Sequence, residues 1–129
     1  MITIEGKPIA QARHRVVRRG NFVASYDPQA KLKAQALLQA GYQQLLHPPI
    51  LCELTAYMPI PKSYSKKKKE ELKGQPHSKR PDVDNIAKFY LDTFGGVCYE
   101  DDGHVSTLVA KKVYSDKPRV EITFTNDKN

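Results

Sequence analysis

The chain lacks most features that mark secreted or membrane proteins. Its two cysteines, Cys52 and Cys98, form neither a CxxC pair nor a disulfide-rich pattern, so we expect buried thiols in a reducing cytoplasm. Thr3, Glu5 and Lys7 interrupt any apolar run near the amino terminus, so we expect no signal peptide. No stretch approaches the roughly 20 apolar residues that span a bilayer.

Several common metal and nucleophile motifs are also missing. The four histidines are scattered, which excludes a Cys/His zinc spacing. An EF-hand is excluded because Ile86 and Ala87 stand where that loop needs an acidic or amide residue and then a glycine. No Ser-His-Asp frame or nucleophile elbow is present. No well-placed D/E-x-K element follows Asp82, which argues against the common restriction-type nuclease core.

Size and composition indicate one globular domain with an anionic partner. The 129 residues suffice for one modest core, and 40% apolar with 27% charged residues is ordinary for a folded protein. Twenty-one Lys and Arg against fourteen Asp and Glu give a net charge of +7. Such a balance favours nucleic acid as the partner, although basicity alone is weak support.

Periodicity predicts an α+β fold over residues 1–129, a mixed β-sheet packed with α-helices. The predicted strands are Met1–Glu5, Ile50–Met58, Val105–Val113 and Arg119–Thr125. The predicted helices run from Pro28 to Leu45 with Asp27 as N-cap, over Ser65–Lys73, and from Asp84 to Gly95. Gly6–Gly20 is predicted to be a basic loop or a loose hairpin, and Gly74–Pro81 a flexible basic segment.

Three stretches predict which side chains share one face of their element, and in the helices this face is expected to cover the core. In the first long helix the expected stripe is Ala30, Ala34, Leu37, Leu38, Tyr42 and Leu45. In the last helix, the cleanest amphipathic pattern of the chain, it is Ile86, Phe89, Tyr90, Thr93, Phe94 and Val97. In the penultimate strand one face is expected to hold Val105, Thr107, Val109 and Val113.

Four of the fourteen acidic residues lie in two loops that flank the last helix: Asp82, Asp84, Asp101 and Asp102. In an extended segment Asp82 and Asp84 would point the same way and raise each other's pKa unless a cation lies between them. Carboxylate oxygens are the ligands that Mg²⁺ and Mn²⁺ prefer. Lys88, one helical turn after Asp84, would share its open face and stabilise charge that develops on a phosphate. The pattern therefore predicts a metal-dependent nuclease.

Simpler interpretations of the same residues remain open. Asp84 alone could be a helix N-cap, and Asp84, Lys88 and Asp92 could form a ladder of surface salt bridges. Asp101-Asp102-Gly103 has the composition of a turn. If the acids are only caps and turns, the chain would be a non-catalytic basic DNA-binding module.

Basic segments lie before and beside the acidic cluster. Those expected to contact DNA phosphates are Arg13, Arg15, Arg18, Arg19, Lys79 and Arg80, with a solvated basic loop as the alternative for the first four. For Lys66–Lys69 solvation is at least as consistent with the pattern as DNA contact.

The signature of Arg80-Pro81-Asp82-Val83-Asp84-Asn85 and Lys88, followed by Asp92 and Asp101-Asp102, resembles the RusA family of Holliday junction resolvases. The resemblance covers most of the chain and includes the opening Ile-Thr-Ile strand, a basic loop and a strand that ends in Met-Pro. The amino-terminal half matches only in the order and character of its elements.

This resemblance implies a homodimeric, Mg²⁺-dependent endonuclease of bacteria and their prophages, with Mn²⁺ as a substitute ion. It would cut four-way DNA junctions by paired symmetric nicks during recombination and repair; another branched nucleic acid is the alternative substrate. By motif position Asp82, Asp84 and Asp102 would bind the metal, and Lys88 would be the essential lysine. This chain is one residue shorter than the family's better-known member before Asp101-Asp102, so Asp101 is the substitute for the preferred Asp102.

Overall fold

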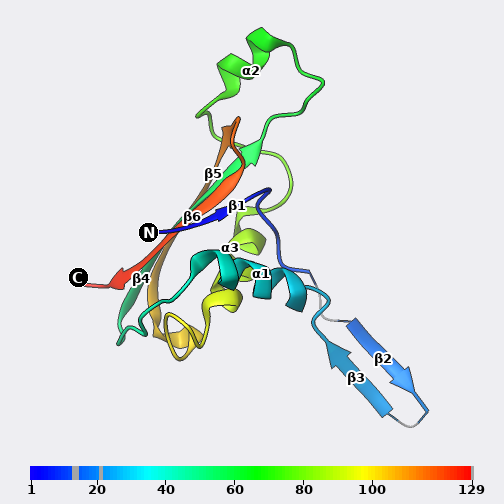
Figure 1. Ribbon diagram of the computed structural model, residues 1–129, viewed down its shortest axis with the longest axis vertical. Coiled ribbons are helices and arrows are strands. Elements are labelled where there is room, and N and C mark those ends of the chain that lie inside the picture. Colours follow the sequence, from blue (N-terminus) through cyan, green and yellow to red (C-terminus); the bar gives the residue numbers. More distant parts are fainter. Residues whose placement is uncertain (13–14, 21, 129) are drawn as a thin grey trace.

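The computed structural model describes residues 1–12, 15–20 and 22–128 and has the predicted α+β architecture, shown in Figure 1. The strands are β1 Ile2–Glu5, β2 Arg15–Arg19, β3 Phe22–Tyr26, β4 Ile50–Pro59, β5 Val105–Ser115 and β6 Arg119–Asn126. The helices are α1 Ala30–Ala40, α2 Lys66–Leu72, α3 Val83–Phe94 and the short 3₁₀ helix η1 Asp102–His104. No helix in these described ranges is long and apolar enough to cross a membrane.

A four-stranded mixed sheet in the order β1-β6-β4-β5 forms the frame. The central strand β4 pairs antiparallel with β6 and parallel with β5, and β1 closes the other edge antiparallel to β6. Alternate residues of β4 are buried, as the predicted period of two requires. The mixed sheet of the sequence prediction is therefore confirmed.

Helix α3 supplies most of the apolar surface that covers one face of the sheet. Five members of its predicted stripe, Ile86, Phe89, Tyr90, Thr93 and Phe94, are all buried, and Val97 is partly buried, so this prediction is confirmed. The helix ends where the Gly95 amide donates to the carbonyl oxygen of Leu91. Both cysteines are free and buried in the same core, and burial raises the pKa of the Cys52 thiol to about 12.

The prediction for the first long helix is wrong at both ends and for most of its face, although Leu37 of the predicted stripe does pack against the core. Helix α1 begins at Ala30, after a turn in which Asp27 Oδ1 accepts from the Gln29 amide. It ends at Ala40 because Gly41 adopts a φ of +71°, which only glycine takes easily. The buried positions are Lys33 and Ala36, whereas 82% of Leu38 is exposed. Tyr42 and Leu45 of the predicted stripe lie beyond the helix and are exposed too.

The predicted common face of β5 is correct for Thr107, Val109 and Val113 but wrong for Val105. The pairing of β4 with β5 shifts register by one residue between Ile50–Val105 and Leu51–Thr107. A shift of one residue turns every later side chain to the opposite face. Thr107, Val109 and Val113 therefore lie on the face away from the helices, and Lys112 lies on the same face as the buried β4 residues.

The segment predicted to be flexible, residues 74–81, is in fact fixed along β5. The Gly74 amide donates to Tyr114 O, the Tyr114 amide to Gln75 O, and the His77 amide to Lys112 O. The Lys112 ammonium then donates to the carbonyl oxygens of Lys79 and Pro81. The chain thus enters α3 from a fixed direction.

The region Gly6–Gly20 contains the loose hairpin of the two sequence alternatives, extended to Tyr26. Strands β2 and β3 pair antiparallel from Arg15–Tyr26 to Arg19–Phe22 and form their own two-stranded sheet. In Figure 1 this hairpin extends away from the main sheet at the end opposite to α2. The molecule therefore carries a projecting element at each end, with α3 between them.

Candidate active site

Helix α3 begins inside the acidic motif. Asp82 is the N-cap, with extended backbone angles but no capping hydrogen bond from its side chain. Asp84 lies in the first turn, where its Oδ1 accepts from the Asn85 amide. The premise that both aspartates leave one extended segment is therefore wrong, because only Asp82 has extended geometry. Both carboxylates sit near the positive end of the helix dipole, which favours negative charge there.

Lys88 and Asp102 meet at one hollow of about 280 Å³, which Gln11, Leu91 and Asp92 also line. Lys88 comes from the middle of α3, and Asp102 opens the 3₁₀ helix after it. Both side chains are exposed, and neither forms a salt bridge within the described ranges. The hollow thus joins a cation and a carboxylate whose charges are not paired within the chain.

Asp101 and Asp102 have different structural roles. Asp101 caps η1: its Oδ1 accepts from the Gly103 amide at 3.0 Å, the turn predicted for this tripeptide. The Asp102 carboxylate lies instead beside the end of α3, where a Cβ added to Gly95 would be 3.5 Å from its Oδ1. Asp102 is therefore the neighbour whose carboxylate is available at the Lys88 hollow.

A second hollow of about 550 Å³ contains Asp82 and Asn85 and is lined by Lys7 and Arg80 as well. One wall is the strap of residues 7–12, which crosses α3. The Gln11 amide donates to the Asn85 carbonyl at 2.9 Å, and the Ile9 amide donates to the Tyr90 hydroxyl at 3.2 Å. The strap continues to Gln11 in the first hollow, so the two hollows are neighbours along α3.

The salt-bridge ladder considered for α3 does not form. Asp92 pairs with Lys33 of α1 at 2.5 Å, and Lys33 also pairs with Asp27 at 2.5 Å. Burial alone would lower the pKa of Lys33, but the hydrogen bonds that its ammonium group donates to Asp27 and Asp92 outweigh this effect, so the pKa is raised. Lys88 is left facing the hollow. Asp84 is not the N-cap either, because Asp82 occupies that position.

Three contributors lie outside the motif and were missed by sequence reasoning. The side chain of Gln11 lines the Lys88 hollow, and its Oε1 is buried without a hydrogen-bond partner among the described residues. Lys33 links α1 to α3, and Lys112 fixes the backbone before Asp82. Of these three, only Lys33 could have been found from the sequence, as a charged residue on the buried face of α1. The incorrectly predicted apolar stripe of this helix placed Lys33 on the wrong face.

The donor chemistry of Asp82, Asp84 and Asp102 fits a divalent cation, because all three are exposed carboxylates with oxygen donors. Within the described ranges, however, no three His, Cys, Asp or Glu side chains gather closely enough to hold a metal ion. Asp82 lies at one hollow and Asp102 at the other. Their role as ligands stays a prediction.

The predicted DNA-binding residues fall in two regions. Arg15, Arg18 and Arg19 lie on β2 of the projecting hairpin, and Arg13 lies outside the described residues. Lys79 and Arg80 lie directly before Asp82 and are exposed. Lys79 Nζ donates to the Tyr64 hydroxyl at 3.1 Å, and Arg80 lines the hollow that contains Asp82.

Comparisons with known proteins identify the family of this chain. A family model described as "Endodeoxyribonuclease RusA" matches residues 5–125. The uncharacterized protein YqaN of Bacillus subtilis (strain 168) is 35% identical over 130 residues, which cover 93% of this chain and 91% of the relative. The match spans the strap, the hairpin, α3 and both closing strands, so the chain belongs to the RusA family of endodeoxyribonucleases, the Holliday junction resolvases.

Proposed function

We propose that the protein is a Mg²⁺-dependent, structure-selective endonuclease that resolves four-way DNA junctions by paired symmetric nicks in recombination and repair. RusA nucleases act on Holliday junctions and depend on a divalent metal. The ion, the pairing of the nicks and the residues that act are our proposals. The observation that carries them is the meeting of Lys88 and Asp102, both unpaired within the described ranges, at one exposed hollow beside α3.

In this proposal Asp82, Asp84 and Asp102 hold the ion and Lys88 binds the scissile phosphate. A bound Mg²⁺ supplies Lewis-acid activation of a phosphate oxygen and of the attacking water. The Lys88 ammonium, which forms no salt bridge within the described ranges, stabilises the negative charge that develops on the phosphate oxygens. Lys79 and Arg80 guide the strand toward Asp82, because they precede it directly and Arg80 lines the same hollow.

Paired nicks require two sites, and the chain is one domain with one copy of the acidic motif. An open four-way junction has two-fold symmetry, which a symmetric homodimer matches. A surface for such a dimer is offered by the exposed apolar side chains in and after α1. Leu38 is 82% and Tyr42 93% exposed, with Leu32 and Leu45 beside them in sequence. A Leu38→Glu change should shift the sedimentation of the protein toward the monomer.

The test uses the purified protein, a synthetic four-way junction and a matched linear duplex, with Mg²⁺, with Mn²⁺ and with a chelator. We expect symmetric nicks in the junction alone and none with the chelator. Asp84→Asn should abolish cutting and keep junction binding. Glu53→Gln removes the same charge from an exposed position of β4 and should cut normally. Cutting by Asp84→Asn would contradict the assignment.

A substrate panel separates the remaining alternatives. Preferred cutting of flaps or RNA with the same acidic residues would indicate a metal nuclease for another branched nucleic acid. Binding without cutting in any metal would indicate a non-catalytic DNA-binding module.

A further inference from the structure

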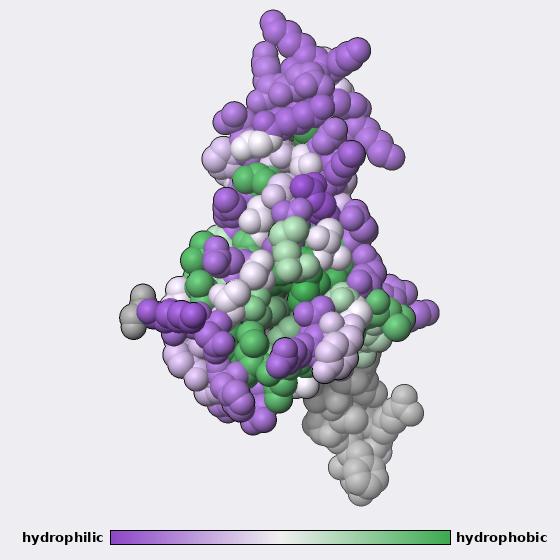
Figure 2. Space-filling model, turned by 60° about the vertical axis from the view of Figure 1, so that its left-hand side comes forward, coloured by the Kyte–Doolittle hydropathy of each residue, from purple (hydrophilic) through white to green (hydrophobic). Residues whose placement is uncertain are grey.

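The segment from Lys62 to Lys73 concentrates positive charge at one end of the molecule. It contains six lysines, Lys62, Lys66, Lys67, Lys68, Lys69 and Lys73, against Glu70 and Glu71. Helix α2 has no buried residue, so it adds nothing to the core. In Figure 2 this end of the molecule is covered by hydrophilic residues. Gathering like charges on an exposed helix costs stability, which points to an external anionic partner.

The structure separates these lysines into paired and unpaired groups. Lys73 pairs with Glu70 at 2.8 Å and Asp116 at 3.5 Å, and the Lys68 ammonium lies 3.9 Å from the centre of the Tyr64 ring. By contrast, Lys62, Lys66, Lys67 and Lys69 form no salt bridge in the described part of the chain.

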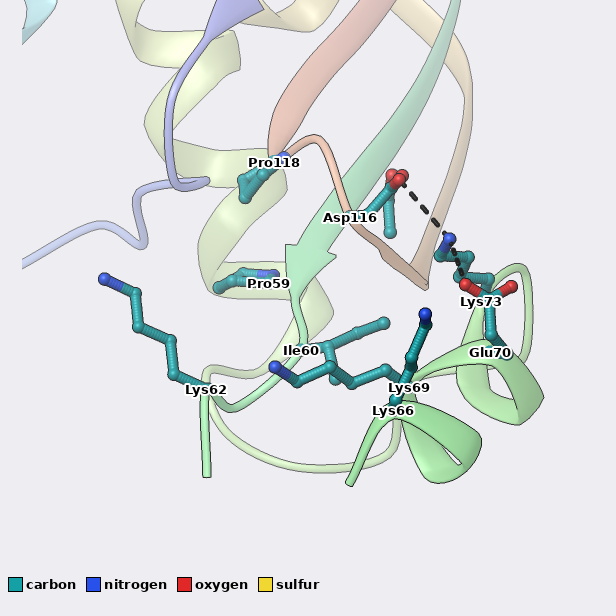
Figure 3. Close-up of a pocket in the computed structure, with 10 residues that line it drawn as sticks. Pro59, Ile60, Lys62, Lys66, Lys69, Glu70, Lys73, Asp116 and Pro118 are labelled. Carbon is teal, nitrogen blue, oxygen red and sulfur yellow. Dashed lines mark hydrogen bonds and ion pairs between the residues drawn. The ribbon is translucent and has the colours of Figure 1, made fainter. Parts of the chain in front are cut away.

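Three of these four lysines, Lys62, Lys66 and Lys69, line one hollow of about 370 Å³ beneath α2, shown in Figure 3. Lys73 and its ion-pair partners Glu70 and Asp116 line it as well. Lys66 and Lys69 are three residues apart and so share one face of the helix. Apolar residues contribute to the lining: Pro59 and Ile60 at the end of β4, and Pro118 from the turn before β6. Ammonium groups beside an apolar surface match a sugar-phosphate backbone, whose phosphates are charged and whose sugar rings have an apolar face.

This hollow is connected to the candidate active site through a chain of neighbouring hollows. The next one shares Pro59 with it and is lined by Lys7, Lys79 and Arg80. The one after that again includes Lys7 and Arg80, and it contains Asp82. A basic track therefore runs from α2 to the amino-terminal end of α3.

We propose that the hollow beneath α2 binds the phosphate backbone of one duplex arm of the substrate and that the track directs a strand of this arm to Asp82. The proposal rests on the proposed function for the identity of the substrate. The β2–β3 hairpin, whose arginines are also expected to contact DNA, extends from the opposite end of the molecule. In this proposal α2 and the hairpin therefore contact different arms of the junction. Because ammonium groups recognise phosphates and not base edges, this contact is independent of sequence.

The test compares two double variants that remove the same charge. The first variant, Lys66→Gln with Lys69→Gln, removes two lysine ammonium groups from the lining of the hollow. Lys67→Gln with Lys111→Gln is the control: Lys67 lies on α2 but does not line the hollow, and Lys111 is exposed on β5. Junction affinity is measured by fluorescence anisotropy over a range of salt concentrations with a chelator present, and arm protection by hydroxyl-radical footprinting.

We expect the Lys66/Lys69 variant to bind the junction about tenfold more weakly, with a salt slope lower by about 2, since each lost phosphate contact removes about 0.9. The hydroxyl-radical footprint of this variant should be shorter than that of the wild type at the far end of one junction arm. The control should change little. Shortening the junction arms stepwise should weaken binding by the wild-type protein until its affinity equals that of the Lys66/Lys69 variant. Equal losses in both double variants, or an unchanged footprint, would overturn the proposal.

The same data separate this proposal from the proposed function. If the wild type cuts no junction but the Lys66/Lys69 variant still loses affinity and footprint, the hollow binds DNA and only the resolvase assignment fails. If the wild type cuts junctions and the two double variants bind them alike, the resolvase assignment stands and the contact at α2 is refuted.

Discussion

The ammonium group of Lys112 lies 2.7 Å from the carbonyl oxygen of Pro81, the residue immediately before Asp82. The same group donates to the carbonyl oxygen of Lys79 at 2.5 Å. One side chain of β5 thus holds two backbone oxygens of the segment that leads into α3. Hydrogen bonds from a cation are stronger than those between neutral groups, so this contact restricts where Asp82 can lie.

Replacing Lys112 with Met should therefore weaken metal use more than it weakens DNA binding. We expect the Mg²⁺ concentration for half-maximal cleavage to rise roughly tenfold, as for other partners that orient a ligand. Junction affinity in chelator should change less. Lys112→Arg keeps donors at the position and should restore part of the loss. Lys111→Met, on the exposed face of the same strand, is the control. A wild-type Mg²⁺ dependence in Lys112→Met would refute the positioning role.

Asp101 and Asp102 should respond differently to the same change. Asp102→Asn should reduce junction cleavage by about 100-fold or more if its carboxylate acts at the Lys88 hollow. Asp101→Asn should keep most of the cleavage and also the cap of η1, because the Asn amide oxygen can accept from the Gly103 amide as the carboxylate does, so the free energy of unfolding should change little. Cleavage rates and urea unfolding of both variants check this. Loss of cleavage only in Asp101→Asn would reverse the assignment.

The fold was most predictable where one segment carries its own pattern. The α3 stripe is read correctly because its buried residues keep helical spacing up to Gly95. In α1 the apolar spacing misleads, since its inner face is made by Ala36 and by Lys33, whose burial depends on partners distant in sequence. The register shift after Val105 in β5 has no sequence signal of its own, and it reverses the face of Val109.

The residues of the candidate site divide in the same way, into those that a local sequence pattern reveals and those that only the fold brings together. Asp82, Asp84 and Lys88 are close in sequence, so one motif contains them. Gln11 reaches the Lys88 hollow only because the strap is hydrogen-bonded across α3, a contact between residues 11 and 85. Such long-range placement follows from packing and topology, which a single sequence does not encode as a local pattern.

Lys33 should be a structural link whose loss lowers the stability of the fold. It is largely buried and bridges Asp27, next to the end of β3, to Asp92 on α3. Lys33→Met leaves both carboxylates without this cation and should lower the free energy of unfolding by roughly 1–2 kcal/mol. The cost is below that of a fully buried pair, because half of the Asp92 side chain is exposed.

A double-mutant cycle with Asp92→Asn measures this link. The two changes should be less than additive, since each removes the same ion pair. Lys31→Met, an exposed position two residues earlier on α1, gives the background effect of losing a lysine. Additive losses would show that Lys33 and Asp92 do not stabilise each other.

His77 should make the stability of the protein depend on pH on the acidic side of neutrality. Burial lowers the pKa of its imidazole, and the nearby charges of Lys112 and Lys79 lower it further. Between this lowered value and the ordinary 6.5, the unfolded chain binds more protons than the folded one. The contribution of His77 is therefore fully present above pH 6.5 and is lost as the pH falls through that window. His77→Gln should flatten this part of the stability curve, measured by urea unfolding at successive pH values. An unchanged slope in His77→Gln would refute this role of His77.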